Sequence, residues 1–286
     1  MQSFPAKVLL FGEHTVLYGG RALAVPFERF SAKWVRRESA DQRLLDLGDY
    51  LRKSKEKRNW LSVDQFIEDI SNGWQLDSNV PLGYGVGSSG TVCAAVYARY
   101  ARGEDADLTT IRQRLASIES FFHGSSSGLD PIVSLRNSPM IADASGCQET
   151  TVNDRMLAHI FLLDSGQARR SSTIIPELRQ RFETNTGWRE LVRAEWMQPT
   201  EQLIQNMITN EYSDELEAPL RRLSNFQFEH LGQLIPGQFH QFKNESSFCL
   251  KLCGAGGGGF LIGYAFDRNI TLQTLKEYNT YWLLDN

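Results

Sequence analysis

The chain has 286 residues, a length that accommodates about two ordinary domains. Hydrophobic residues make up 41% of the sequence and charged residues 22%, which excludes a disordered chain and an integral membrane protein. Thirty basic residues stand against 34 acidic ones, and the resulting net charge of -4 argues against a protein that binds nucleic acid by neutralising phosphates.

In the first half, apolar runs predict strands at residues 8–11 and 22–25, and an alternating pattern predicts a third at 30–34. Charged residues dominate 36–58, which indicates an exposed connection with some helix. Helical spacing or small apolar residues predict four helices, over residues 62–70, 91–100, 108–122 and 131–135.

In the second half, residues 160–163 are predicted to form a buried strand, and residues 176–235 to be almost wholly helical. Two further strands are predicted at 248–252 and 260–266. We expect two domains, over residues 1–155 and 156–286.

The four cysteines contain no Cys-x-x-Cys pair, so we expect reduced thiols in a cytoplasmic protein and no zinc site. The N-terminal residues contain no apolar run long enough for a signal peptide or a membrane span. We therefore expect no membrane partner.

Glycine is distributed unevenly: fourteen of the 23 glycines fall in four short windows, at residues 12–20, 83–90, 124–128 and 254–259. Glycine gathered in this way marks backbone that turns sharply or closely approaches another group. The windows are therefore candidate parts of a binding site.

The second window, Pro81 to Gly90, precedes an apolar helix. Such a loop points backbone N–H groups and the positive end of the helix dipole at one place, which favours an anion. Ser88 and Ser89 could bind phosphate oxygens or Mg²⁺. The dinucleotide fingerprint, the protein-kinase glycine loop and the Walker loop each fit only in part, since the chain lacks the preceding strand, the companion motifs and the lysine, respectively. A tight turn with a helix cap is the simplest alternative.

The third window separates two carboxylates, Glu119 at a helix end and Asp130 at the start of the next segment. A hairpin there would bring both to one cleft, where one could hold a hard cation and the other accept a proton. The alternatives are an ordinary helix end with an N-cap, and a serine hydrolase elbow at 124–128 with Asp164 and His230 or His240. The elbow requires a strand leading in, whereas a helix is predicted here.

Lys7 precedes the first strand, and Glu13 and His14 follow it; alone, these residues would be ordinary surface or core groups. The fourth window has five glycines in six positions, more than a simple hairpin turn requires. It predicts a close approach of backbone to a ligand or another loop.

Taken together and in order, the four windows resemble the motifs of the GHMP kinase superfamily. Lys7 to Gly20 is similar to the first motif, Pro81 to Ser89 to the phosphate loop, and Lys251 to Gly259 to the third motif. His123 to Asp130 is similar to the segment His-Gly-x-x-Ser-Gly-x-Asp, and this form favours the mevalonate kinase branch.

The resemblance implies an α+β fold with a ribosomal-S5-domain-2-like N-terminal domain, a ferredoxin-like C-terminal domain and the site between them. It implies an ATP- and Mg²⁺-dependent kinase of isoprenoid biosynthesis that converts mevalonate to 5-phosphomevalonate and acts as a monomer or homodimer. Another acceptor (phosphomevalonate, a sugar or homoserine) and a non-catalytic binding protein are the alternatives.

The resemblance also implies roles for residues. Asp130 would be the base or the orienting carboxylate for the substrate hydroxyl, with Lys7 beside it, and Glu119 and Ser89 would hold Mg²⁺. The residues implied to contact ATP are Gly83, Gly85, Val86, Gly87, Ser88, Ser89, Gly90 and Thr91. Those implied to contact the acceptor are Glu13, His14, Ser127, Gly128, Gly256 and Gly257, and Arg169 or Ser172 is a candidate to contact an anionic acceptor.

Three positions depart from the family pattern: Ala6 replaces a usual Gly, Gly90 a usual Ala and Ser126 a usual Pro. None of these departures removes a catalytic side chain, but Ser126 leaves the identity of the acceptor substrate undecided.

Overall fold

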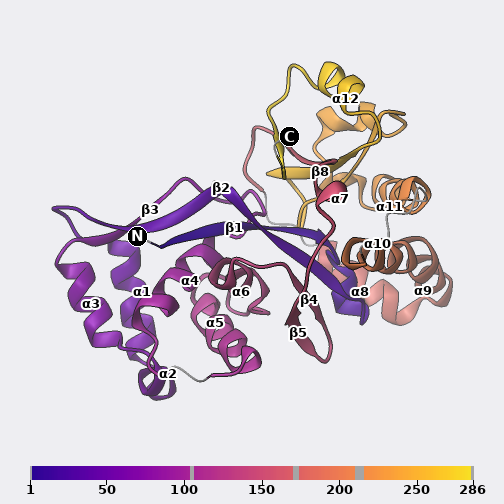
Figure 1. The fold of residues 1–286 in the computed structure, drawn as a ribbon. Coiled ribbons are helices and arrows are strands. Elements are labelled where there is room, and N and C mark those ends of the chain that lie inside the picture. Colours follow the sequence, from indigo (N-terminus) through magenta and orange to yellow (C-terminus); the bar gives the residue numbers. More distant parts are fainter. Residues whose placement is uncertain (1, 104–105, 170–173, 210–215, 285–286) are drawn as a thin grey trace.

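The computed structural model describes residues 2–103, 106–169, 174–209 and 216–284, and Figure 1 shows their arrangement. Within these ranges two antiparallel sheets are present, one in each half of the chain. This mixture of helices and separate sheets agrees with the predicted α+β class. No helix in the described part of the chain combines the length and apolar character needed to cross a membrane.

The first sheet contains five strands in the described residues: β1 (Ser3–Phe11), β2 (Ala22–Arg36), β3 (Trp74–Ser78), β4 (Met140–Asp143) and β5 (Gly146–Glu149). β2 pairs with β1, β3 and β4 and so organises the sheet. The two strands predicted at 22–25 and 30–34 are one strand. The register against β1 shifts between Pro5 and Ala6, and this irregularity, not a turn, breaks the sequence pattern of β2.

Six helices cover one face of this sheet in the described residues (Figure 1). They are α1 (Gln42–Arg52), α2 (Lys55–Trp60), α3 (Val63–Ser71), α4 (Ser88–Tyr100), α5 (Leu108–His123) and α6 (Leu129–Arg136). α4 is the buried helix expected from its small apolar residues, although it begins three residues earlier than predicted, at the end of the glycine loop.

The second sheet has the order β7-β8-β6-β9, with bounds Phe248–Leu252, Phe260–Ala265, Ile160–Asp164 and Thr280–Trp282. The helical segments of this half are α7 (Asp154–Leu157), α8 (Ile174–Thr184), α9 (Thr186–Val192), the π-helix η2 (Arg193–Met197), α10 (Gln198–Ile208), α11 (Glu217–His230), η4 (Gly232–Leu234), η5 (Gly237–Phe242) and α12 (Arg268–Thr274). The predictions at 160–163, 248–252 and 260–266 are confirmed.

The strands β3, β4, β5 and β9 were not predicted. They span three to five residues, too few for an apolar run or an alternating pattern to identify a strand. Their strand conformation depends on pairing with partners elsewhere in the sheets, which local sequence does not encode.

Two apolar clusters stabilise the fold. One lies between the first sheet and helices α1 to α6. The other joins Val8 and Leu10 of β1 to Phe161 and Leu163 of β6, and therefore connects the two halves. The halves are packed against one another, and the domain boundary near residue 155 stays a prediction.

Candidate active site

A cleft of about 380 Å³ lies where the end of β1, the glycine loop and the fourth glycine window meet. Its lining combines charged groups with backbone of glycine. The lining residues are Lys7, Leu9, Gly12, Glu13, His14, Val16, Leu17, Gly83, Gly85, Gly87, Ser88, Ser89, His123, Asp130, Arg169, Gly254 and Ala255.

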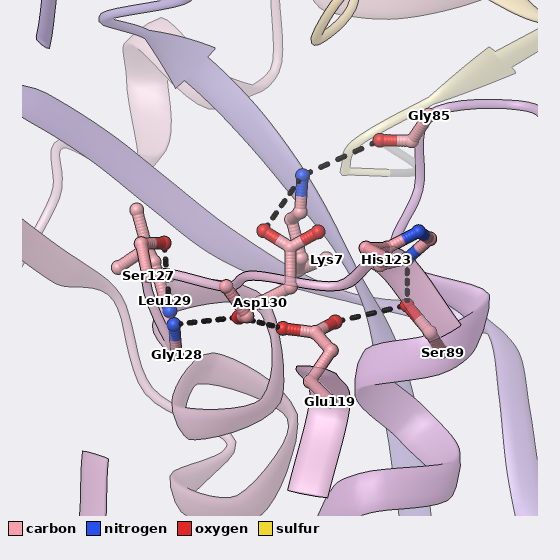
Figure 2. A network of polar contacts seen from close by, with 10 residues as sticks. Lys7, Gly85, Ser89, Glu119, His123, Ser127, Gly128, Leu129 and Asp130 are labelled. Carbon is pink, nitrogen blue, oxygen red and sulfur yellow. Dashed lines mark hydrogen bonds and ion pairs between the residues drawn. The ribbon is translucent and has the colours of Figure 1, made fainter. Parts of the chain in front are cut away.

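An ion pair between Lys7 and Asp130 lies at the centre of this cleft (Figure 2). Lys7 Nζ is 3.1 Å from Asp130 Oδ1 and donates a hydrogen bond of 3.3 Å to Gly85 O. The Lys7 side chain is 5% exposed, whereas that of Asp130 is 33% exposed. The Gly85 carbonyl thus holds the buried lysine in place, and the partly exposed Asp130 carboxylate is accessible to a ligand.

Two glycines allow close packing around the site, Gly87 against the Lys7–Asp130 pair and Gly128 against α5. Gly87 has φ 75°, and a Cβ there would lie 3.1 Å from Lys7 Cγ and 3.4 Å from Asp130 Oδ2. Gly128 has φ 72° at the start of α6, and a Cβ would collide with Arg112 O. Both positions need left-handed backbone and a missing Cβ, so glycine is required.

A second polar network lies beside the ion pair, around Glu119 of α5. Ser89 Oγ donates to Glu119 Oε1 at 2.9 Å and lies 3.0 Å from His123 Nε2. Ser126 Oγ donates to Glu119 Oε2 and accepts from the Gly128 backbone N–H at 2.9 Å. Figure 2 shows the chain of contacts that runs from Gly128 through Glu119 and Ser89 to His123.

Glu119 is 4% exposed, and no basic side chain of the described residues forms an ion pair with it. Burial, reinforced by the negative charge of Asp130, raises the pKa of its carboxyl, and the hydrogen bonds from Ser126 and Ser89 partly oppose this. A buried carboxylate and a hydroxyl that converge from two helices are hard oxygen donors. Lys7 pairs with Asp130, so the negative charge of the Glu119 carboxylate has no counter-ion among the described residues. These oxygens and this charge suit Mg²⁺, which proteins commonly hold through one or two carboxylates and the substrate phosphates.

A second ion pair links the two halves behind the cleft. Lys251 Nζ of β7 lies 3.0 Å from Glu13 Oε1, and Gln227 Nε2 of α11 donates to the same oxygen at 2.6 Å. Burial raises the pKa of Glu13, and Lys251 counteracts the effect. Glu13 therefore serves first as a structural link, although it also lines the cleft.

Two buried polar atoms beside this pair lack a hydrogen-bond partner among the described residues: Glu13 Oε2 and His14 Nε2. His14 has a positive φ of 61°, and burial lowers its pKa to about 4, so its imidazole is neutral near pH 7. Unsatisfied buried atoms are costly, and their position at the cleft points to a ligand with polar groups.

The structure divides the predicted ATP-binding residues into two sets. Gly83, Gly85, Gly87, Ser88 and Ser89 line the cleft, whereas Val86, Gly90 and Thr91 are buried behind it. Gly90 packs on Asp130, where a Cβ would lie 2.9 Å from the Asp130 carbonyl carbon. The close approach of α4 and α6 accounts for Gly90 in place of the alanine usual in the resembled family.

Four predicted acceptor residues do not line the cleft in the described structure. Ser127 and Gly128 use their polar groups at the start of α6, where Ser127 Oγ accepts from Leu129 N at 3.3 Å. Gly256 packs on Leu234, and Gly257 N donates to Leu234 O at 2.7 Å. Gly254 and Ala255 take the expected place at the cleft, because the loop turns away after them.

The sequence predictions missed His123 as a site residue and the pocket next to the cleft. This pocket, of about 510 Å³, shares Ser88, Ser89 and His123 with the cleft and is otherwise bounded by side chains such as Leu76, Val80, Val92, Phe121 and Phe122. The Phe-Phe pair before His123 was an available signal, but β3 was not predicted, and so the opposite wall could not be placed.

The serine hydrolase alternative finds no support in the geometry of the described residues. Ser126 is bonded to Glu119 and Gly128, whereas His240 Nε2 lies near the carbonyls of Gly232 and Ile235. A helix, α5, leads into the segment, so the strained strand-to-helix elbow is missing. Ser172, the other candidate for contact with an anionic acceptor, lies outside the described residues.

Comparisons with known proteins agree with this geometry. Residues 52–137 match the family described as GHMP kinases N terminal domain. A mevalonate kinase of Methanothermobacter thermautotrophicus is 27% identical, with 92% of this chain and 89% of that protein covered. A mevalonate kinase of Thermococcus sibiricus is 22% identical, with 96% of this chain and 91% of that protein covered.

Solved structures are similar over almost the full length. The Methanococcus jannaschii mevalonate kinase superposes with a TM-score of 0.67 at 16% identity, covering 98% of this chain and 96% of that one. The Streptococcus pneumoniae phosphomevalonate kinase gives a TM-score of 0.67 at 15% identity, covering 98% and 97%. The predicted fold and the predicted resemblance to GHMP kinases are confirmed.

Proposed function

We propose that this chain, which resembles the GHMP kinases in sequence and fold, transfers the γ-phosphoryl group of ATP to a hydroxyl of mevalonate. One observation carries the proposal: the Lys7–Asp130 pair lies beneath the glycine loop, with the Glu119–Ser89 oxygens beside it. Phosphoryl transfer requires mainly positioning and charge neutralisation, and these residues supply both.

The nucleotide would lie along the glycine loop. The N-terminus of α4 opens onto the cleft at Ser88 and Ser89, where backbone N–H groups and the helix dipole favour phosphate. The adjoining pocket is walled by Leu76, Val80 and Phe122 and suits the base of the nucleotide. Because Ser88 and Ser89 line both pockets, the phosphates would lie between the base and the acceptor.

Glu119 and Ser89 would hold Mg²⁺ on the phosphates. Bound there, the ion neutralises charge on the transferring phosphoryl group. Glu119 would face the ion as a carboxylate in spite of its raised pKa, because a divalent cation favours the charged form.

Asp130 would orient the acceptor hydroxyl and receive its proton as the oxygen attacks phosphorus. Lys7, at 3.1 Å, pairs with the Asp130 carboxylate and would stabilise negative charge that develops on the oxygen. Because Gly85 O also holds the ammonium, the lysine needs little reorganisation during the reaction.

The acceptor end of the cleft suits a small branched hydroxy acid. Arg169 supplies a cation for a carboxylate, and the buried, unpartnered atoms Glu13 Oε2 and His14 Nε2 would pair with a second hydroxyl. Leu9, Val16 and Leu17 form an apolar wall that would accommodate a methyl group. Mevalonate carries all three features.

Phosphomevalonate is the second candidate, since the phosphomevalonate kinase fold is equally similar. Among the described residues that line the cleft, however, Lys7 and Arg169 are the lysine and arginine side chains. A single cation matches one carboxylate better than a carboxylate together with a phosphate.

We also place the protein in the cytoplasm, with domains over residues 1–155 and 156–286. The four cysteines are unpaired, as expected in a reducing compartment, and the two sheets lie on either side of residue 155.

The test is a coupled assay for ADP with purified protein, Mg²⁺ and each of mevalonate, phosphomevalonate, homoserine and galactose. We expect ADP formation with mevalonate at a kcat/KM at least tenfold above the others. Absence of ADP with every acceptor would refute the kinase, and nucleotide binding without turnover would indicate a binding protein.

A further inference from the structure

Ser126 is the position at which this chain departs from the proline usual in the resembled family, and the structure shows what its hydroxyl does. Ser126 Oγ lies between two partners, the Gly128 backbone N–H and Glu119 Oε2. Proline has neither a hydroxyl nor a side-chain donor, so it could not make the second contact.

The direction of these hydrogen bonds is fixed by counting protons. The Gly128 N–H can only donate, so Ser126 Oγ accepts there, at 2.9 Å. The single hydroxyl proton of Ser126 is therefore available to Glu119, whose carboxylate can only accept. Backbone at the start of α6 thus sets the orientation of a donor aimed at the buried carboxylate of α5.

Glu119 would swing more freely without this donor. Its other oxygen is held by Ser89, which would itself bind the cation. Ser126 is consequently the one described side chain that holds Glu119 and is not itself a proposed metal ligand.

We propose that Ser126 is a positioning residue that holds the Glu119 carboxylate in the orientation required to bind the metal of the metal–nucleotide complex. The inference rests on the proposed function only in taking Glu119 as a metal ligand. It differs from a mere capping role, because Ser127 already accepts from Leu129 N in the same turn. A cap alone would alter stability and leave metal affinity unchanged.

The test compares Ser126→Ala and Ser126→Thr with Ser125→Ala, a matched control at an exposed neighbour. The affinity of Mn²⁺ for the protein–ADP complex is measured by electron paramagnetic resonance, and metal-free ADP binding by calorimetry. With Ser126→Ala we expect Mn²⁺ to bind about fivefold more weakly, the effect of one hydrogen bond of about 1 kcal/mol. We expect metal-free ADP affinity to change less than twofold, Ser126→Thr to restore most of the Mn²⁺ affinity, and Ser125→Ala to match the parent protein.

Two results would overturn the proposal: unchanged Mn²⁺ affinity in Ser126→Ala, or an equal weakening of metal-free ADP in the same variant. Urea unfolding of each variant checks that the folded state is populated throughout. Neither measurement involves an acceptor or turnover, so failure of the proposed function appears separately, as absence of ADP formation in the parent protein.

Discussion

The molecule contains two lysine–carboxylate pairs of similar length that differ in their surroundings. In the Lys7–Asp130 pair the carboxylate is 33% exposed, whereas in the Lys251–Glu13 pair both side chains are almost wholly buried, at 6% and 1%. Each lysine lies on a strand and also donates to a backbone carbonyl, of Gly85 or of Leu252. The two pairs therefore differ in the surroundings of the carboxylate: Asp130 is exposed to the cleft, whereas Glu13 is enclosed by protein.

The open pair is suited to chemistry and the closed pair to structure. Asp130 has room for an acceptor hydroxyl, while Glu13 is committed to Lys251 and Gln227 across the two halves. A buried pair contributes little net stability, but removal of one partner leaves an uncompensated charge. Mutation of the Lys7–Asp130 pair should therefore mainly lower kcat, whereas mutation of the Lys251–Glu13 pair should mainly lower the free energy of unfolding.

The largest effect is expected for Asp130→Asn. The substitution removes the proton acceptor at the centre of the cleft, so kcat should fall by about 10³-fold or more, equivalent to about 4 kcal/mol in the barrier. ADP binding, measured by calorimetry, should be retained. Asp49→Asn on an exposed face of α1 is the control. A kcat within tenfold of the parent value would remove Asp130 from the chemistry.

The next effect is expected for Lys251→Met, measured as the free energy of unfolding in urea. It leaves the Glu13 carboxylate buried without its counter-ion and should cost about 3–5 kcal/mol. Lys7→Met should cost less stability, because water can solvate Asp130, yet it should reduce kcat more. Adding Glu13→Gln to Lys251→Met should recover part of the stability. Equal stability losses for the two lysine variants would contradict the distinction between the pairs.

A pH-dependent effect is expected at His14, which lies next to the closed pair. Its folded pKa of about 4 is below the ordinary value of 6.5, so the unfolded chain binds more protons between these pH values. Stability should therefore fall as the pH is lowered from about 6.5 to 4, by on the order of 3 kcal/mol from this group.

His14→Asn tests this contribution, because asparagine tolerates the positive φ of 61° and does not titrate. The difference in unfolding free energy between parent and variant should shrink toward low pH. A constant difference over pH 4–7 would show that His14 does not carry the dependence.

The smallest effect is expected at a contact nearer the surface. Tyr18 of η1 (Thr15–Tyr18) stacks on Phe182 of α8 with ring centroids 4.1 Å apart, and so links the two halves near the cleft. A double-mutant cycle with Tyr18→Leu and Phe182→Leu should give a coupling energy of about 1 kcal/mol. A coupling energy larger than the loss of unfolding free energy in Lys251→Met would show that the Tyr18–Phe182 contact joins the two halves more strongly than the Lys251–Glu13 pair.

The sequence located the parts of the site but not their orientation. Lys7, Asp130, Glu119 and Ser89 were placed together because their motifs occur in a known order, and the structure brings them into contact. Motifs alone could not show whether Thr91, Ser127 and Gly257 face the cleft. Their polar groups instead form hydrogen bonds with nearby backbone groups, and these bonds depend on the local turns of the folded chain.

Long-range pairing accounts for most of the remaining errors. The break between residues 25 and 30 reflected a register shift against β1, and the short strand β3 exists through its pairing with β2. His123 was missed because nothing in its own segment reveals that Ser89, 34 residues earlier in the chain, lies 3.0 Å away. These features depend on contacts that form only in the folded chain.

The fourth glycine window also makes the site depend on a distant part of the chain. A Cβ at Gly259 would lie 2.5 Å from Tyr84 Cα, and one at Gly85 would lie 2.8 Å from Cys253 O, so the two loops touch backbone to backbone. The glycine loop at residues 83–90 is therefore supported by residues about 170 positions later in the chain. A chain that ends before β7 and β8 should therefore lack this backbone support for the glycine loop.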